Sequence, residues 1–169
     1  MIKAILACDD EGGVSKDGTL PWPNNSKDLK WFKVNTAGHV VVMGSTTWDD
    51  PHMPRPLPNR TNILVTTRPQ DYPGAHGYIE GDLCDEIKAI EEQFPGLITW
   101  IIGGPKIIEQ TLGIIDEFYI SRIPGEYDCD TFLPLMKINT LFEIDHLEGD
   151  PEEVIFQIWK KRKTNETVS

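Results

Sequence analysis

Short runs of apolar, mostly β-branched residues recur along the chain and are bounded by Gly, Pro or Asp. Runs of this length between turn residues are typical of buried strands. The pattern predicts strands over Ile2–Cys8, His39–Met43, Thr61–Thr66, Leu97–Ile102, Glu117–Ile123, Leu141–Leu147 and Val154–Lys160.

Helical patterns separate several of these runs. The segment Lys27–Asn35 follows Ser26, a suitable N-cap, and Gly104–Leu112 has proline at its first helical position. A short helix is also expected just after Gly44. The segment Asp82–Phe94 has apolar residues at helical spacing on one face, namely Leu83, Ile87, Ile90 and Phe94.

Strands alternate with helices through the first two thirds of the chain, which predicts an α/β fold with a largely parallel sheet. No helix is expected between the last three strands, so the C-terminal edge of the sheet should include an antiparallel hairpin. A length of 169 residues is typical of one domain. We expect this domain to span residues 1–162, followed by a frayed polar tail over 163–169.

Charge and cysteine usage exclude several classes of partner. The 16 Lys and Arg residues against 27 Asp and Glu residues give a net charge of -11, which disfavours nucleic acid and anionic membranes. The 3 cysteines contain no C-x-x-C pair and the 4 histidines are scattered, so no disulfide framework or metal site is expected. The apolar N-terminal run is too short for a signal peptide or a membrane span. We expect a cytoplasmic protein, monomeric, with a small-molecule partner.

Three strand ends share polar and glycine-rich chemistry: Gly44–Thr47, Thr66–Arg68 and Gly103–Lys106. In open α/β sheets, ligands bind beyond the carboxyl ends of the strands, where glycine lets backbone N–H groups approach an anion. A Gly-Gly pair alone usually marks only a tight turn. The chain has neither G-x-G-x-x-G nor a P-loop, which argues against an ordinary Rossmann or kinase site. Three such ends together favour a nucleotide-like ligand.

One carboxylate stands out at the start of the first predicted helix. Asp28 lies in its first turn, and Trp31 and Phe32 follow at i+3 and i+4 on the same face. The helix dipole favours the ionised carboxylate, whereas burial among aromatic rings disfavours it. An aspartate at a helix start is usually only a solvated charge. The aromatic neighbours and the preceding Pro21-Trp22-Pro23 loop favour a cleft enzyme that uses this carboxylate.

The motifs of the chain resemble those of the dihydrofolate reductase family in order and spacing, up to the last strand. They are Leu20-Pro21-Trp22, Asp28-Leu29-x-Trp31-Phe32-Lys33, Val42-Met43-Gly44-x-x-Thr47-Trp48, Arg55-Pro56-Leu57-Pro58-x-Arg60-x-Asn62, Ile102-Gly103-Gly104, Tyr119-Ile120-Ser121 and Asp130-Thr131. The resemblance implies a single-domain dihydrofolate-reductase-like fold. Its central sheet would be mostly parallel and eight-stranded, with an antiparallel C-terminal strand and about four flanking helices.

The resemblance also implies a reaction. Hydride from NADPH would reduce C6 of 7,8-dihydrofolate, giving tetrahydrofolate for one-carbon and thymidylate metabolism. Asp28 would hold the pterin and promote protonation at N5, Ser121 would hydrogen-bond this carboxylate in place of a family threonine, and Trp22 would bind a water nearby. Arg60 would bind the α-carboxylate of the glutamate tail. The other implied substrate contacts are Ile5, Ala7, Phe32, Arg55 and Leu57.

The implied cofactor contacts are Ala7, Gly13, Val14, Ser15, Lys16, Asp17, Gly18, Thr19, Leu20, Thr46, Thr47, Thr66, Thr67, Arg68, Ile102, Gly103, Gly104, Pro105, Lys106, Ile107 and Ile108. Residues 12–18 would form a lid over the nicotinamide and exclude water. The family also implies a cis peptide bond between Gly103 and Gly104.

The chain departs from the family pattern at several positions. Ser15 and Pro105 stand where glycines are usual, and Ile108 replaces an aromatic residue near the nicotinamide. Ser45 and Thr46 replace a basic residue that would meet the cofactor phosphates. Arg68 and Lys106 remain as partners for the 2′-phosphate, so we expect NADPH rather than NADH.

Two other functions fit parts of the sequence. A riboflavin-pathway reductase of the same fold would not need the pair Asp28 and Arg60. A catalytically weak folate- or nucleotide-binding structural protein would be consistent with the missing basic and aromatic groups. An intact Asp28, lid and Gly103-Gly104 turn favour catalysis. Dihydrofolate-dependent oxidation of NADPH separates these possibilities.

Overall fold

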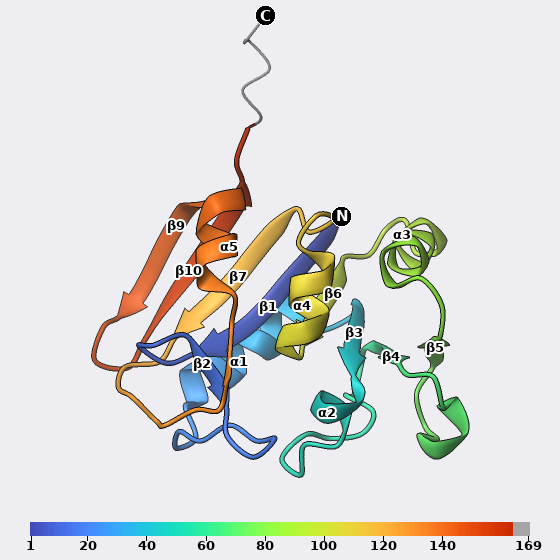
Figure 1. Cartoon of the computed structure of the whole chain (residues 1–169), viewed down its shortest axis with the longest axis horizontal. Helices are drawn as coiled ribbons and strands as arrows, with labels where there is room; N and C mark the ends of the chain where they lie inside the picture. Colours follow the sequence, from blue (N-terminus) through green and yellow to red (C-terminus); the bar gives the residue numbers. More distant parts are fainter. Residues whose placement is uncertain (164–169) are drawn as a thin grey trace, which may run out of the picture.

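The computed structural model describes residues 1–163 and contains one eight-stranded sheet, in the order β5-β4-β3-β6-β1-β7-β10-β9 (Figure 1). Its strands are β1 (Ile2–Cys8), β3 (Val40–Gly44), β4 (Thr61–Val65), β5 (Gly77–Ile79), β6 (Thr99–Gly103), β7 (Glu117–Arg122), β9 (Phe142–Asp150) and β10 (Val154–Lys161). A separate two-stranded ladder joins β2 (Gly13–Ser15) to β8 (Thr131–Phe132).

The strands from β5 to β7 are parallel, and β10 runs antiparallel to both β7 and β9. The mostly parallel sheet and the C-terminal hairpin are therefore confirmed. The expectation that no helix separates the last strands is wrong, because α5 (Leu135–Leu141) lies between β7 and β9. Asn139 and Thr140 are weak helix formers, and the helix is too short for clear periodicity. Tertiary packing holds it, since Ile138 is fully buried in the core.

The other helices are α1 (Ser26–Thr36), α2 (Ser45–Trp48), α3 (Leu83–Gln93) and α4 (Pro105–Thr111), which with α5 makes five helices where about four were expected. A 3-10 turn covers Pro69–Asp71. The N-cap of α1 is Asn25 rather than Ser26, because the Asn25 side chain accepts a hydrogen bond of 3.0 Å from the Asp28 N–H. This bond satisfies one of the free N–H groups of the first turn.

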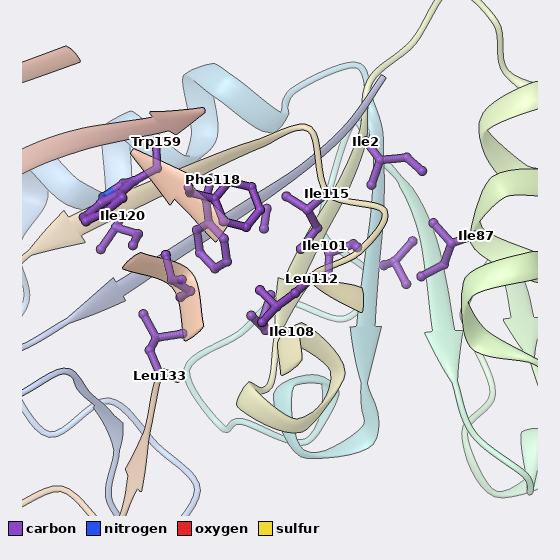
Figure 2. Packing of buried hydrophobic residues seen from close by; sticks show 14 of the residues in the cluster. Ile2, Ile87, Ile101, Ile108, Leu112, Ile115, Phe118, Ile120, Leu133 and Trp159 are labelled. Atoms are coloured by element: carbon purple, nitrogen blue, oxygen red, sulfur yellow. The ribbon is translucent and has the colours of Figure 1, made fainter. Parts of the chain in front are cut away.

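Each face of the sheet has its own apolar core, because side chains alternate between the two faces along a strand. On one face, α3, α4 and α5 pack against β1, β6 and β7. Figure 2 shows Phe118 and Ile120 of β7 beside Trp159 of β10, with Ile108 of α4 in the same cluster. On the other face, Trp31 and Phe32 of α1 pack against a second cluster from β1, β3, β4 and β6. Trp48 of α2 belongs to the same cluster, so α1, α2 and nearby loops contribute side chains to the face that carries Asp28.

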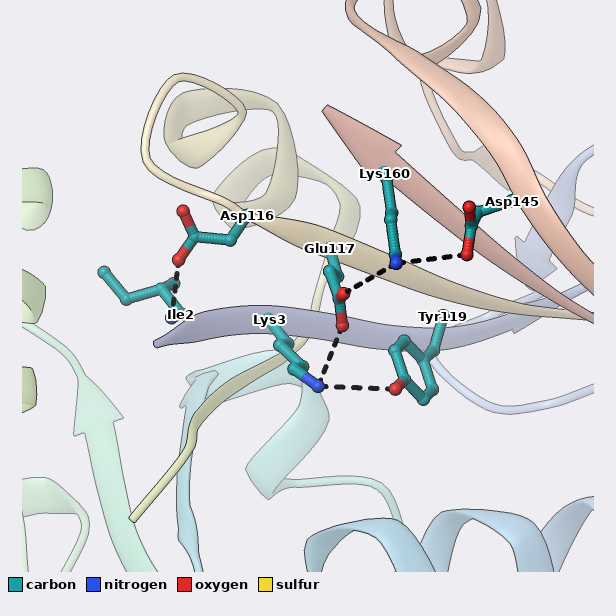
Figure 3. A network of polar contacts seen from close by, with 7 residues as sticks. All are labelled: Ile2, Lys3, Asp116, Glu117, Tyr119, Asp145 and Lys160. Carbon is teal, nitrogen blue, oxygen red and sulfur yellow. Dashed lines mark hydrogen bonds and ion pairs between the residues drawn. The ribbon is translucent and has the colours of Figure 1, made fainter. Parts of the chain in front are cut away.

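A row of charges crosses this second face at the end of the sheet away from the loops (Figure 3). Lys3 lies 2.8 Å from Glu117, and Lys160 lies 3.1 Å from Asp145 and 4.0 Å from Glu117. Charges of opposite sign thus alternate across β1, β7, β10 and β9, which stabilises the strand register. Lys3 also donates to the Tyr119 hydroxyl at 3.3 Å. Burial lowers the pKa of Lys3, but its bonds to Glu117 and Tyr119 outweigh that effect and raise it.

No helix within residues 1–163 is both long and apolar enough to cross a membrane. The frayed tail expected over 163–169 lies, beyond Lys163, outside the described residues.

Candidate active site

The three polar strand ends meet at one edge of the sheet. β4, β3 and β6 are adjacent and parallel, so Thr66–Arg68, Gly44–Thr47 and Gly103–Lys106 follow neighbouring strands at their carboxyl ends. β1 continues this edge on the far side of β6 and ends at Cys8. The tertiary structure therefore brings together segments as far apart along the chain as Cys8 and Gly103.

Backbone segments approach one another closely at this edge. A Cβ atom on Gly44 would lie 2.7 Å from Ile107 Cδ1, and one on Gly103 would lie 3.3 Å from Thr47 Oγ1. Gly103 has φ +126, which favours glycine, and its peptide bond to Gly104 is cis, as the resemblance implied. Glycines leave the backbone at this edge without side chains, and Thr46, Thr47, Thr66 and Thr67 supply hydroxyl groups beside it. Such donors suit the phosphates of a dinucleotide. We call these three strand ends the cradle.

The basic groups expected near this cradle are exposed. Arg68 Nε lies 3.4 Å from Asp71 Oδ2, and the Lys106 side chain is at the surface. Ile108, implied by the resemblance to be a cofactor contact, is 0% exposed and packs in the core formed with α3 and α5. The side chain of Ile108 is therefore a core residue in this structure, because α4 turns that position toward the sheet.

Asp28 lies in the first turn of α1 against β7. Burial raises the pKa of its carboxyl, and a hydrogen bond with the Ser121 side chain partly offsets the rise. Ser121 is 1% exposed and pairs with Ala7 of β1 and Phe156 of β10 across the sheet. The structure therefore brings together the carboxylate and the hydroxyl that the resemblance paired.

Aromatic rings form the wall beside Asp28. Trp31 stacks on Phe156 with ring centroids 4.3 Å apart and contacts Tyr119 at 6.1 Å. Trp22 is 7% exposed and meets Tyr127 edge to face at 5.9 Å. Burial of the Asp28 carboxyl group is the physical cause of its raised pKa.

Arg60 is fixed to the other end of α1. Its Nε donates to the Pro58 carbonyl at 2.9 Å, its Nη1 donates to Thr36 Oγ1 at 3.0 Å, and its guanidinium lies over the Phe32 ring at 5.8 Å. Burial lowers the pKa of this guanidinium. Both ends of α1 thus carry a charged group, a carboxyl at the start and a guanidinium beside the last turn.

The sequence interpretation gave no role to Asn62, which positions the proline-rich segment. Asn62 is fully buried, accepts from the Leu57 N–H at 2.8 Å and donates to the Leu57 and Arg60 carbonyls at 3.0 Å each. A polar residue within the apolar strand Thr61–Val65 was the signal that could have identified it. Of the remaining expected substrate contacts, Ile5 and Leu57 are buried on the α1 face, and Arg55 is exposed, 3.9 Å from Asp49.

Residues 12–18, which the resemblance implies to be a lid, pair with the loop that leads into β8 and with β8 itself. Gly13 and Ser15 of β2 pair with Phe132 and Thr131, and the side chains of Ser15 and Thr131 are hydrogen-bonded. Two further contacts extend the seam, by which we mean the contact between residues 13–17 and residues 128–132. The Asp17 N–H donates to Asp130 Oδ2 at 2.9 Å, and Lys16 Nζ lies 2.9 Å from Asp128 Oδ2. Val14 is buried, whereas Leu20, just after residues 12–18, is 46% exposed.

A glycine-rich edge of a mostly parallel sheet and a partly desolvated carboxylate on α1 fit an α/β enzyme that binds a small-molecule ligand. A family model described as "Dihydrofolate reductase" matches residues 1–159. The chain therefore belongs to the dihydrofolate reductase family, whose members are NADPH-dependent oxidoreductases. The resemblance in its motifs is confirmed.

Known proteins similar to this chain come from several sources. It is 30% identical to "Dihydrofolate reductase type 8" from Escherichia coli over 167 residues, covering 96% of this chain and 98% of that protein. It is 34% identical to a dihydrofolate reductase from Haemophilus influenzae over 130 residues, covering 77% of this chain and 76% of that protein. Its fold is similar to that of dihydrofolate reductase from Enterococcus faecalis complexed with NADP(H) and RAB-propyl. The TM-score is 0.77 at 26% identity, with 96% of this chain and 97% of that chain covered.

Proposed function

We propose that this chain reduces 7,8-dihydrofolate to tetrahydrofolate, with Asp28 promoting protonation at N5. The observation that carries the proposal is the environment of Asp28, whose burial raises its pKa while Ser121 hydrogen-bonds it. A carboxyl group with a raised pKa keeps its proton closer to neutral pH, as a proton-transfer group needs. It can also form paired hydrogen bonds with an amidine-like edge such as N3 and the 2-amino group of a pterin.

The residues around Asp28 have distinct proposed roles. Ser121 orients the carboxyl group through its hydroxyl, and Trp22 orders a water near it. Ile5, Ala7 and Phe32 contact the faces of the pterin ring. Exclusion of water by these side chains strengthens the hydrogen bonds of the carboxyl group to the substrate.

The proline-rich segment is proposed to hold the rest of the substrate. Arg60 already uses two N–H groups to fix its position on α1 and the loop. Its remaining N–H groups can bind the α-carboxylate of the glutamate tail. Arg55 and Leu57 belong to the same segment. Leu57 would make an apolar contact with the substrate, and its backbone is held in place by Asn62.

The residues at the sheet edge fit NADPH, which supplies the hydride when bound. Gly44 lets the Ile107 side chain pack against β3, and a Cβ atom on Gly104 would meet nothing within 4 Å, so the backbone at Gly104 is open to a bound cofactor. The proposed contacts are Ala7, residues 13–20, Thr46, Thr47, Thr66, Thr67, Arg68 and residues 102–108, the last through the backbone at Ile108. Arg68 and Lys106 would bind the 2′-phosphate, which favours NADPH over NADH. A KM for NADH below that for NADPH would contradict this assignment.

We also propose that residues 1–162 form a single domain, that the protein is a monomer and that it acts in the cytoplasm. One continuous sheet from Ile2 to Lys161 supports the single domain. The 3 cysteines are free, which is consistent with a reducing compartment.

Oxidation of NADPH, followed by its absorbance with and without dihydrofolate, tests the proposed activity. We expect oxidation only with dihydrofolate present, inhibition by antifolates and loss of turnover in Asp28→Asn. Tight binding of folate with no turnover would contradict the proposal, because the cleft would then serve binding alone.

A further inference from the structure

Asp9, at the point where the chain leaves β1, is a buried carboxylate outside the proposed site. It is 1% exposed. Its Oδ1 atom accepts from the backbone N–H of Gly13 at 2.8 Å and of Glu11 at 2.9 Å. Its Oδ2 atom accepts from the Tyr127 N–H at 3.2 Å and from Cys129 Sγ at 3.4 Å. A buried carboxylate with this many donors is held in one position.

The two oxygens of Asp9 serve two different segments of the chain. Glu11 and Gly13 belong to the root of the lid, whereas Tyr127 and Cys129 belong to the loop that leads into β8. Both segments continue directly into the β2–β8 ladder. The carboxylate of Asp9 therefore links the segment at the start of β2 to the segment that leads into β8.

The packing around this bridge leaves little room for another arrangement. A Cβ atom on Gly13 would lie 2.5 Å from both Cβ and Sγ of Cys129, so the lid backbone fits closely against that side chain. Burial raises the pKa of Asp9, but the hydrogen bonds from Gly13, Glu11, Tyr127 and Cys129 outweigh it and hold the pKa below its usual value. The carboxylate is therefore ionised at neutral pH, with both oxygens available as acceptors.

We propose that Asp9 is a positioning residue that holds the lid in place for cofactor binding and hydride transfer. This inference rests on the proposed function in taking residues 12–18 as the cover of the nicotinamide. An asparagine in this position keeps the shape of the side chain but has only one acceptor oxygen. The single oxygen of asparagine can accept from the lid or from the loop before β8, but not from both. The NH₂ group then faces the donors of the other segment and cannot accept from them. Asp9→Asn therefore separates the bridging role from simple packing.

A matched control lies at the opposite end of β1. Asp116 accepts a hydrogen bond of 3.0 Å from the Ile2 N–H, as Figure 3 shows. It anchors the backbone at the start of the same strand, at the end opposite to Asp9. Asp116→Asn thus makes the same chemical change and weakens an anchor of the same strand without touching the seam.

Steady-state kinetics of both variants, with their melting temperatures, tests the inference. Bonds to a charged group contribute about 1.5–3 kcal/mol, so we expect kcat/KM for NADPH to fall about 10-fold or more in Asp9→Asn. The KM for dihydrofolate should change less than the KM for NADPH. Asp116→Asn should keep both KM values even if its melting temperature falls.

Equal loss for both substrates in Asp9→Asn, or a lower melting temperature with unchanged NADPH kinetics, would overturn the inference. If Asp9→Asn does not fold, Cys129→Ala provides the test. It removes one of the four donors and should raise the KM for NADPH in the same direction but less, and an unchanged KM would count against the role of Asp9. NADPH binding followed by fluorescence keeps the two proposals distinct. It would still weaken in Asp9→Asn if the wild-type chain failed to reduce dihydrofolate.

Discussion

α1 and α3 begin in nearly the same way and do very different things. Each is 11 residues long and starts with a side-chain N-cap that accepts from the N–H three residues later. In α1 that residue is Asp28, and in α3 it is Asp85, whose N–H lies 2.9 Å from Asp82 Oδ1. Asp28 packs against Ser121 and has a raised pKa, whereas Asp85 is exposed. Local rules produce the same helix start twice, and only the surface against which the helix packs gives one aspartate its chemistry.

The largest effect that separates the two helices is expected in turnover. Proton-transfer groups contribute about 100-fold to 10,000-fold, so Asp28→Asn should lower kcat by at least about 100-fold. Asp85→Asn makes the same change at the same helical position and should leave kcat within a factor of about 2, because it contacts no reacting group. Single-turnover measurement of NADPH oxidation checks both. A comparable loss in the two variants would mean that the helix start, and not the pocket, controls activity.

The C-terminal ends of the helices differ as well. At the end of α1 the Thr36 hydroxyl accepts a hydrogen bond from the Arg60 guanidinium. The last turn of α3 has no basic residue. Arg60→Leu should raise the KM for dihydrofolate about 10-fold to 100-fold, since the bound carboxylate loses charge-assisted hydrogen bonds. The KM for a pterin without the glutamate tail should not change, and a parallel rise for that shortened substrate would show that Arg60 acts by shaping α1 instead.

The pH dependence should also test the environment of Asp28. If protonated Asp28 supports N5 protonation, hydride transfer slows as the pH rises through its raised pKa. The unfolded chain loses this proton at a lower pH than the folded chain, so the contribution of Asp28 to stability falls as the pH rises. Asp28→Asn should therefore be more stable than the wild type at neutral pH and should approach it in acid. Thermal melts from pH 3 to 8 measure this difference, and a difference that does not shrink in acid would contradict it.

The smallest expected effect concerns the caps themselves. Asn25→Ala and Asp82→Ala each remove one side-chain acceptor and should lower the free energy of unfolding by about 1 kcal/mol. Only Asn25→Ala should also lower kcat, because the N–H that it caps belongs to Asp28. Urea melts together with kcat values test this pair, and an equal effect of both variants on kcat would remove the link between cap and catalysis.

Much of the fold could be predicted from periodicity. The longer strands and the helices α1, α3 and α4 follow from the spacing of apolar residues and from residues such as Pro105. The strands β2, β5 and β8 have only 2 or 3 residues each, which is too short to produce a pattern. α5 was missed for a similar reason, since its helical state depends on burial of Ile138.

The residues of the candidate site also differ in how far the sequence could identify them. Asp28 and the Gly103-Gly104 turn could be singled out because their residue types and neighbours are unusual for their positions, whereas Arg60 was indicated by the resemblance to the family. Asn62 could have been noticed as a polar residue in an apolar strand, but its partners, and those of Asp9, belong to segments that only folding brings together. The resemblance implies a cofactor contact at Ile108, and in the structure the Ile108 side chain is buried in the core.

By itself the sequence determined the alternation of strands and helices, the family and the side chains able to perform the chemistry, because these depend on residue type and local spacing. The tertiary structure alone decided which of two similar aspartates is desolvated, which strand ends meet in one cradle and which carboxylate joins the lid to its neighbouring loop. Burial, hydrogen-bond partners and pKa depend on atoms that only folding brings together.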